Sequence, residues 1–234
     1  MDTNHTSKKI VLPLKPTQDL AYICGILAGD GSINYRPKKN EYSIKCVGNP
    51  KDEKEMYTEV IQPTFKKVFG ISPAVKMRDG GTTFGLVIYS KDLVTYLTKT
   101  VGLPLGPRYG KLAIPKLFLG NHSLTTEFIR GVFDTDGCIS FKKRYTQKPY
   151  YPVISLCSKS ERFMRQIARV LKSKGFKLAE LYKYRVTDAR VECGYTIINR
   201  IDLNGSDNFK KWLRDMGFKS PKHQAKIKKV NGKK

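Results

Sequence analysis

The sequence predicts an α+β fold made of two similar halves that pack on each other through one helix from each half. Two observations carry this prediction. An apolar nine-residue segment that ends in Asp-Gly occurs twice, at 23–31 and at 129–137. The same order of hairpin and helix patterns follows both copies, so each half is expected to run αββαββα with antiparallel sheets.

In the first half an apolar helix ends at the Asp-Gly, and two strand patterns separated by turn residues follow it. A charged helix with apolar residues three and four positions apart comes next, then a hairpin around Asp-Gly-Gly and a closing helix. After the first helix, the expected elements are strands at 32–35 and 42–47, a helix at 52–69, strands at 74–77 and 82–89, and a helix at 92–101.

The second half repeats this order, with strands at 138–145 and 151–157, a helix at 160–174, strands at 179–185 and 195–203, and a helix at 207–216. We therefore divide the chain into a first repeat at 17–103, a linker at 104–124, a second repeat at 125–218 and a basic tail at 219–234. The tail is a lysine run, and we expect a mobile, solvated terminus that touches phosphate without reading sequence.

Glycines in the two apolar helices predict close packing. Gly25 and Gly29 lie four residues apart on one face, and Gly131 and Thr135 repeat that spacing. A glycine lowers helix stability relative to alanine, so its place inside a helix indicates that two backbones approach closely. Two buried core helices without any special contact would be the simpler interpretation.

Close packing of these helices would bring Asp30 and Asp136 together at the helix ends. Two adjacent carboxylates repel unless they are protonated or share cations, and hard divalent ions favour such oxygen ligands. A turn-forming aspartate at a helix end is common, and for a single copy that interpretation would be preferred. The recurrence of Asp-Gly at matching positions favours a paired-carboxylate metal site.

The charge of the chain indicates its partner. The 44 Lys and Arg exceed the 20 Asp and Glu by 24, which points to a polyanion. The chain has no long apolar run, no basic amphipathic anchor and no signal peptide. We therefore favour nucleic acid over a membrane and expect a soluble, intracellular protein, cytoplasmic or organellar. Five cysteines without C-x-x-C and three scattered histidines favour neither a zinc site nor a Ser/His/Asp triad.

The two segments, Ile-Cys-Gly-Ile-Leu-Ala-Gly-Asp-Gly and Ile-Arg-Gly-Val-Phe-Asp-Thr-Asp-Gly, resemble two copies of the LAGLIDADG motif. Over 17–218 the chain is similar to monomeric, two-motif LAGLIDADG homing endonucleases. This resemblance implies motif helices at the interface of the repeats and sheets that form a DNA-binding saddle. It also implies site-specific hydrolysis of both strands of a long, non-palindromic target, leaving 3′ overhangs.

The resemblance further implies Mg²⁺ as cofactor, with Mn²⁺ or another divalent ion able to substitute. Double-stranded DNA is the implied partner, and no protein partner is needed by a monomer with internal pseudo-two-fold symmetry. Asp30 and Asp136 are the implied metal ligands and catalytic acids, together with the backbone carbonyls of Gly29 and Thr135. The second motif has a further acid, Asp134, which the first motif lacks, so that position is not a shared requirement.

Accessory residues follow from the same resemblance. Lys91 aligns with the basic residue that the family places near the metals. The matching stretch of the second half, 204–207, has no lysine. This indicates unequal cleavage of the two strands or a lysine from elsewhere, such as Lys142. Asn49 and Ser158 are the candidates for ordering water.

Strands of the saddle would lie in successive major grooves. Basic and polar residues of the hairpins are the candidates for DNA contact, although a plain solvated strand face explains any single one equally well. The candidates are Asn34, Arg36, Lys38, Ser43, Lys45, Lys76, Arg78, Lys142, Arg144, Gln147, Lys183, Arg185, Arg190 and Arg200.

Three other classes of protein compete with this interpretation. A maturase or transcription regulator would use the same basic saddle without cutting, but both motif acids are present here, and a maturase activity beside cleavage stays open. A ribosomal RNA-binding protein would explain the charge but not the paired Asp-Gly. An intein is disfavoured because the chain starts with Met1 and ends in lysines without His-Asn, so we expect a free-standing, intron-encoded enzyme.

Overall fold

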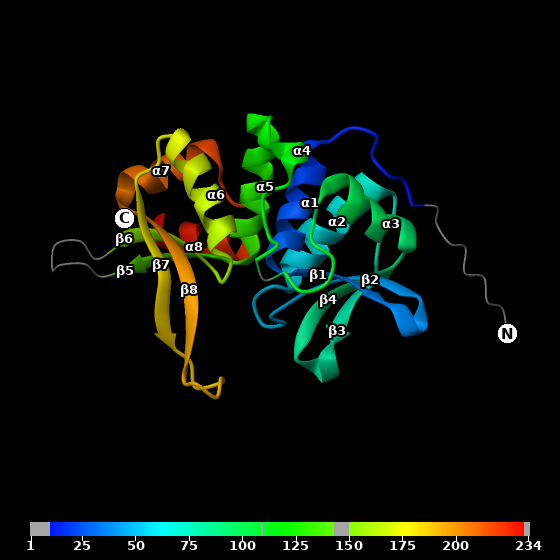
Figure 1. The fold of residues 1–234 in the computed structure, drawn as a ribbon. Coiled ribbons are helices and arrows are strands. Elements are labelled where there is room, and N and C mark those ends of the chain that lie inside the picture. The colour runs from blue at the N-terminus through cyan, green and yellow to red at the C-terminus, as the bar shows by residue number, and fades with distance from the viewer. Residues whose placement is uncertain (1–9, 109, 143–149, 232–234) are drawn as a thin grey trace.

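The computed structural model describes residues 10–108, 110–142 and 150–231. It contains two four-stranded antiparallel sheets, with helices packed on one face of each sheet (Figure 1). Helices α1 (Gln18–Gly29) and α5 (His122–Thr135) lie side by side in the centre of the molecule and join the two halves. The α+β fold with two packed repeats is therefore confirmed.

In the first half the strands are ordered β1-β2-β4-β3. After α1 the elements are β1 (Gly31–Arg36), β2 (Glu41–Gly48), the π-helical turn η2 (Met56–Ile61), α2 (Gln62–Phe69), β3 (Val75–Arg78), β4 (Thr83–Tyr89), α3 (Lys91–Thr95) and the π-helical turn η4 (Tyr96–Val101). Short 3-10 turns, η1 (Pro37–Lys39) and η3 (Asp79–Gly81), connect the strands of the two hairpins.

The second half has the same topology, with strand order β5-β6-β8-β7. Its elements are β5 (Gly137–Lys142), β6 (Tyr151–Ser158), α6 (Glu161–Ser173), β7 (Leu178–Thr187), β8 (Tyr195–Asn204) and α7 (Gly205–Asp215), preceded by α4 (Lys116–Leu119) and followed by α8 (Pro221–Asn231). Identical strand order in both sheets gives the molecule its internal pseudo-symmetry.

The glycine seam between α1 and α5 is confirmed. A Cβ atom placed on Gly25 would lie 2.1 Å from the carbonyl oxygen of Phe128, and one on Gly131 would lie 2.3 Å from that of Tyr22. Real Cβ atoms do not approach oxygen so closely, so only glycine allows these two backbones to touch. The helices therefore pack closer than ordinary side chains permit.

The turn from each motif helix into its first strand also depends on glycine. A Cβ atom on Gly31 would lie 2.5 Å from the carbonyl oxygen of Leu27, and one on Gly137 would lie 2.3 Å from that of Phe133. The strand therefore folds back directly beside the last turn of its helix. The two Asp-Gly sequences thus place an aspartate at the helix end and a strand immediately after it.

The prediction of a mobile, solvated tail is wrong for the described part of that segment. Residues 221–231 form α8, and Ser220 and His223 are only 1 % and 0 % exposed. The lysine run concealed the few side chains that pack inward, namely Ser220, His223 and the partly buried Ile227. The linker is also more structured than predicted, because it contains α4 and the second motif helix already begins at His122. No helix within the described ranges has the length and apolar character that a membrane crossing requires.

Candidate functional site

Asp30 and Asp136 lie together where the two motif helices end. Each directly follows the last residue of its helix as the C-terminal cap, and its N–H donates to the helix backbone, from Asp30 to Ile26 at 3.0 Å and from Asp136 to Val132 at 3.0 Å. A Cβ atom on Gly29 would lie 3.5 Å from the Asp136 carboxyl carbon and 2.0 Å from Thr135 Oγ1. The seam therefore sets the separation of the two acids.

The electrostatics of the pair follow from this placement. Burial, together with the Asp136 and Glu53 carboxylates, raises the pKa of Asp30 to about 8. Burial also raises the pKa of Asp136 to about 6, while Arg108 opposes that rise. Asp136 is nevertheless exposed at the surface, where water screens its charge, so we expect the rise to be smaller there than at the half-buried Asp30. Without a bound cation, Asp30 therefore keeps its proton to a higher pH than an ordinary aspartate.

Replacing Asp30 by asparagine should stabilise the metal-free protein at pH 8. The folded pKa lies above that of the unfolded chain, so stability is lost as pH rises from about 4 to about 8. Below that window the carboxyl is neutral in both states and the advantage of asparagine disappears. We expect a gain of about 1–2 kcal/mol at pH 8 after solvent screening, measured by thermal unfolding in EDTA. A gain that is larger at pH 4 than at pH 8 would contradict this account.

Arg108, from the segment expected to be linker, reaches the same place. Its Nη1 donates to the carbonyl oxygens of Ala28 and Gly29 at 2.6 Å each. The Gly29 carbonyl, expected to contact metal, thus accepts from a guanidinium here. Sequence reasoning missed this residue because a single arginine among prolines and glycines carries no local signal. Its position indicates that this carbonyl pair attracts cations.

Glu53 and Lys222 form an ion pair near the site that the sequence also did not predict. Lys222 Nζ lies 2.5 Å from Glu53 Oε1, across 169 residues of sequence. The other Glu53 oxygen accepts the backbone N–H of Asn49 at 2.6 Å, and the Asn49 side chain accepts from the N–H of Lys51 at 2.9 Å. The Asn49 side chain, predicted to order water, therefore contributes to the turn between β2 and the following helix.

The oxygen groups at the helix ends suit a hard divalent ion. Among the described residues, no group of three or more His, Cys, Asp or Glu side chains is arranged to hold a metal. Two carboxylates with backbone carbonyls nevertheless match the ligands that Mg²⁺ takes, since this ion usually keeps several waters and binds substrate phosphate as well. The Thr135 hydroxyl donates to the backbone of Gly131 and Val132, so only its carbonyl is a candidate ligand.

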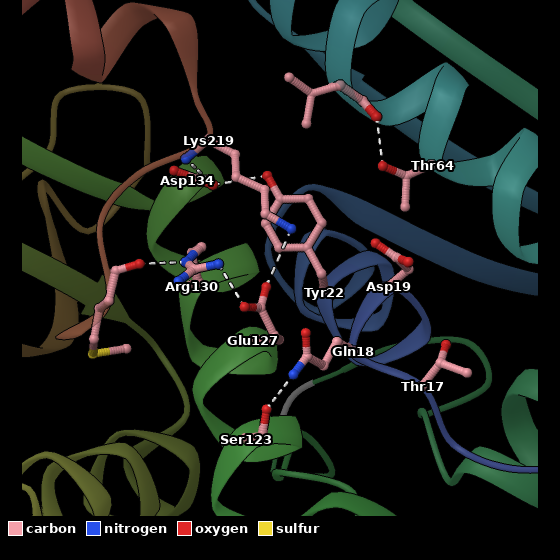
Figure 2. A network of polar contacts seen from close by, with 12 residues as sticks. Thr17, Gln18, Asp19, Tyr22, Thr64, Ser123, Glu127, Arg130, Asp134 and Lys219 are labelled. Atoms are coloured by element: carbon pink, nitrogen blue, oxygen red, sulfur yellow. Dashed lines mark hydrogen bonds and ion pairs between the residues drawn. The ribbon is translucent and has the colours of Figure 1, made fainter. Parts of the chain in front are cut away.

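Asp134 has a different environment from the acid pair (Figure 2). It is 2 % exposed and accepts from Tyr22 Oη at 2.7 Å and from the backbone N–H groups of Lys219 and Ser220 at 3.0 and 3.2 Å. Close by, Lys219 and Arg130 both pair with Glu127. Asp134 therefore joins the motif helices to the start of the tail, which agrees with its absence from the first motif.

Lys91 and Ser158 remain candidate accessory residues of the site. Lys91 is exposed at the start of α3, and its Nζ stands 5.9 Å from the ring centre of Tyr42. Ser158 lies with Asp136 in the wall of a cavity of about 580 Å³ between the two halves. This cavity is also lined by Ser32 and Asn34 of the first sheet and by Arg108. Asp136, rather than Asp30, is the acid of the pair that lines this space between the sheets.

The first sheet gathers its predicted DNA contacts on one face. Register pairs Asn34 with Ser43, Ser32 with Lys45, and Arg78 with Thr83, so these residues share the face opposite the helices. Asn34, Arg36, Ser43, Lys45, Lys76 and Arg78 all lie on this open face, and Lys38 lies in η1. Ser43 is only 8 % exposed, and Lys45 pairs with Asp79 at 2.6 Å.

In the second sheet a β-bulge changes the expected pattern. Regular alternation would place Lys183 and Arg185 on the face of Arg200, but a register shift between Leu181 and Tyr184 moves them to the other face. Lys183 accordingly lies 3.7 Å from Glu161 on the helix side. Arg185 therefore does not share the face of Arg200, and contact of Lys183 and Arg185 with DNA stays a prediction.

Other candidates of the second sheet lie at its open face or its ends. Arg200 pairs with Asp202 at 2.8 Å, and Lys142 is exposed at the end of β5. Arg190 pairs with Asp188 in the loop of the β7–β8 hairpin. Arg144 and Gln147 lie outside the described residues.

Comparison with known proteins gives a family match in the second half. Residues 123–217 match the family model of the LAGLIDADG-like domain. The first half has the same strand order and the same Asp-Gly helix end.

The whole chain has the fold of solved homing endonucleases. The structure of I-DmoI in complex with DNA and Ca has a TM-score of 0.59 and 17 % identity, covering 90 % of this chain and 97 % of that chain. The corresponding structure with DNA and Mn has a TM-score of 0.57 and 18 % identity, covering 86 % and 96 %. I-WcaI bound to its DNA recognition sequence has a TM-score of 0.54 and 13 % identity, covering 86 % and 82 %.

Two curated relatives are much longer than this chain. A glutamine–fructose-6-phosphate aminotransferase of Methanocaldococcus jannaschii is 24 % identical over 99 % of this chain, which spans 19 % of that enzyme. The NrdEB alpha subunit of ribonucleoside-diphosphate reductase of Bacillus subtilis is 29 % identical over 52 % of this chain and 11 % of its own length. The two named activities differ and the aligned shares are small, so neither is carried over to this chain.

Proposed function

We propose that this protein is a site-specific, metal-dependent endonuclease that cuts both strands of a long DNA target. The observation that supports this proposal most strongly is the pair Asp30 and Asp136, which glycine contacts bring together at the ends of two equivalent helices. A protein that only bound nucleic acid would have no use for two carboxylates at the centre of a basic molecule, where they repel phosphate.

Asp30 and Asp136 would hold Mg²⁺, or another divalent ion, together with the Gly29 and Thr135 carbonyls. When bound, the ion supplies Lewis-acid activation of the scissile phosphate and a water of lowered pKa. The carboxylates fix the place of this chemistry, because the rigid helix pair sets their separation. Arg108 neutralises part of their charge and lies in the wall of the cavity into which a phosphate would enter.

The sheets would bind the DNA. Basic and polar side chains on the open face of the first sheet, with Arg200 and Lys142 of the second, suit β-strand contacts to the major groove. An excess of 24 positive charges favours phosphate and makes affinity fall as salt rises. Because one chain supplies both acids and both sheets, we infer that it acts as a monomer, and the DNA complexes of the similarly folded I-DmoI and I-WcaI support this inference.

Cleavage of a pooled library of long duplex targets tests the proposal. The protein is incubated with the library in Mg²⁺, in Mn²⁺ and in EDTA, and the ends of broken molecules are sequenced. We expect breaks at one recurrent sequence, with 3′ overhangs, in either metal and none in EDTA. Breaks without sequence preference, or a library left intact in both metals, would contradict the proposed function.

A further inference from the structure

The start of the tail is held at the helix pair by Asp134. One carboxylate accepts from the hydroxyl of Tyr22 and the N–H of Lys219 (Figure 2) and also from the N–H of Ser220, so it ties α1, α5 and the tail together. Ser220 is 1 % exposed, and His223 in the first turn of α8 is completely buried. The first turn of α8 therefore has a fixed place beside the motif helices.

Lys222, in that first turn, crosses to the first half of the molecule. Its side chain is 18 % exposed, and that of its partner Glu53 is 14 % exposed. An exposed ion pair contributes little and can be incidental, but a lysine held away from water has lost much of its hydration. The general basic charge of the tail does not explain why this one lysine forms a shielded ion pair across the two halves of the chain.

Because the Lys222 ammonium contacts the Glu53 carboxylate, the position of Glu53 also gives the position of the ammonium. Gly31 pairs with Cys46 in the register of β1 and β2, so Asp30 stands beside the last residues of β2. A Cβ atom on Gly48, at the end of that strand, would lie 2.1 Å from Glu53 Oε2. Glu53 and the ammonium that it holds therefore lie on the Asp30 side of the acid pair.

We propose that Lys222 is a lysine of the cleavage centre on the Asp30 side, additional to the candidate Lys91, held by Glu53 and directed at the phosphate of one strand. The proposal rests on the proposed function. The ammonium forms and breaks no covalent bond; it offsets charge that develops on the phosphate as water attacks and the bond to the 3′ oxygen breaks. Because the lysine lies on one side of the acid pair, its effect falls on one strand.

Strand-resolved cleavage of a duplex labelled differently on each strand tests this role. We compare the wild type with Lys222→Met, the charge-preserving Lys222→Arg, and Lys228→Met as a matched control on the exposed side of α8. We expect Lys222→Met to slow cutting of one strand by about tenfold or more relative to the other, so nicked duplex accumulates. Lys222→Arg should restore most of the lost rate, and Lys228→Met should keep the wild-type strand ratio.

Two further measurements separate this role from tethering of the tail. Duplex affinity in Ca²⁺ and the thermal unfolding midpoint should change little in Lys222→Met. An unchanged strand ratio in Lys222→Met, or equal slowing of both strands with a lower unfolding midpoint, would overturn the role of Lys222 while the wild type still cuts. A wild-type protein that leaves both strands intact would instead overturn the proposed function itself, and this inference with it.

Discussion

Asp136→Asn is expected to reduce formation of double-strand breaks by about a thousandfold while leaving DNA binding in place. Asparagine keeps the shape of the side chain at this solvent-open helix end but removes the charge that holds a divalent ion. Loss of metal activation removes several kcal/mol of transition-state stabilisation, and each 1.36 kcal/mol corresponds to a tenfold change in rate.

The measurement pairs initial cleavage rates in Mg²⁺ with duplex affinity in Ca²⁺. Asp92→Asn is the matched control, because Asp92 is an exposed acid in the first turn of α3, outside the helix seam. The control should cut at the wild-type rate. Cleavage by Asp136→Asn within tenfold of the wild type would show that this carboxylate is not a metal ligand.

Gly25→Ala is expected to destabilise the protein by about 3 kcal/mol or more, the largest effect on folding that the seam predicts. The added methyl would lie 2.1 Å from the Phe128 carbonyl oxygen and 3.1 Å from the Cα atom of Gly131. Both neighbours are backbone, so the helices must separate, and overpacking of this kind costs about 1–3 kcal/mol or more. For a chain of this size the unfolding midpoint should fall by about 6–12 °C.

The sign of this effect is what distinguishes the seam from an ordinary helix. In an unconstrained helix, alanine is favoured over glycine by about 1 kcal/mol, so the midpoint would rise. Gly120→Ala provides the control, because no atom lies within 4 Å of a Cβ placed there. A Gly25→Ala protein as stable as the wild type would contradict close packing of the two motif helices.

The parts of the fold that could be predicted from sequence are those with a local pattern that occurs twice. The alternation of apolar residues in strands, their three- and four-residue spacing in helices and the Asp-Gly turns can each be recognised locally. The recurrence of Asp-Gly at matching positions distinguished a site from two ordinary helix ends. The four-residue spacing of Gly25 with Gly29, and of Gly131 with Thr135, was informative because glycine inside a helix has a cost that close contact explains.

Features that join distant parts of the chain had no such signal. The Lys222–Glu53 pair spans 169 residues, and Arg108 reaches Gly29 from a segment with linker composition. A lysine run also conceals the half-buried Lys222 among exposed lysines. The β-bulge near Lys183 reverses the face of every later residue of β7, and single-sequence alternation cannot reveal such a shift.

Iron-directed cleavage of the protein backbone tests most directly whether the two acids form one metal site. Fe²⁺ replaces the divalent ion in the DNA complex, and ascorbate with peroxide generates radicals that cut the chain beside bound iron. The account predicts cuts at 28–31 and at 134–137 together, both suppressed by excess Mg²⁺ and both lost in Asp136→Asn. Cuts near only one of these positions, or cuts that survive in Asp136→Asn, would contradict a shared metal centre.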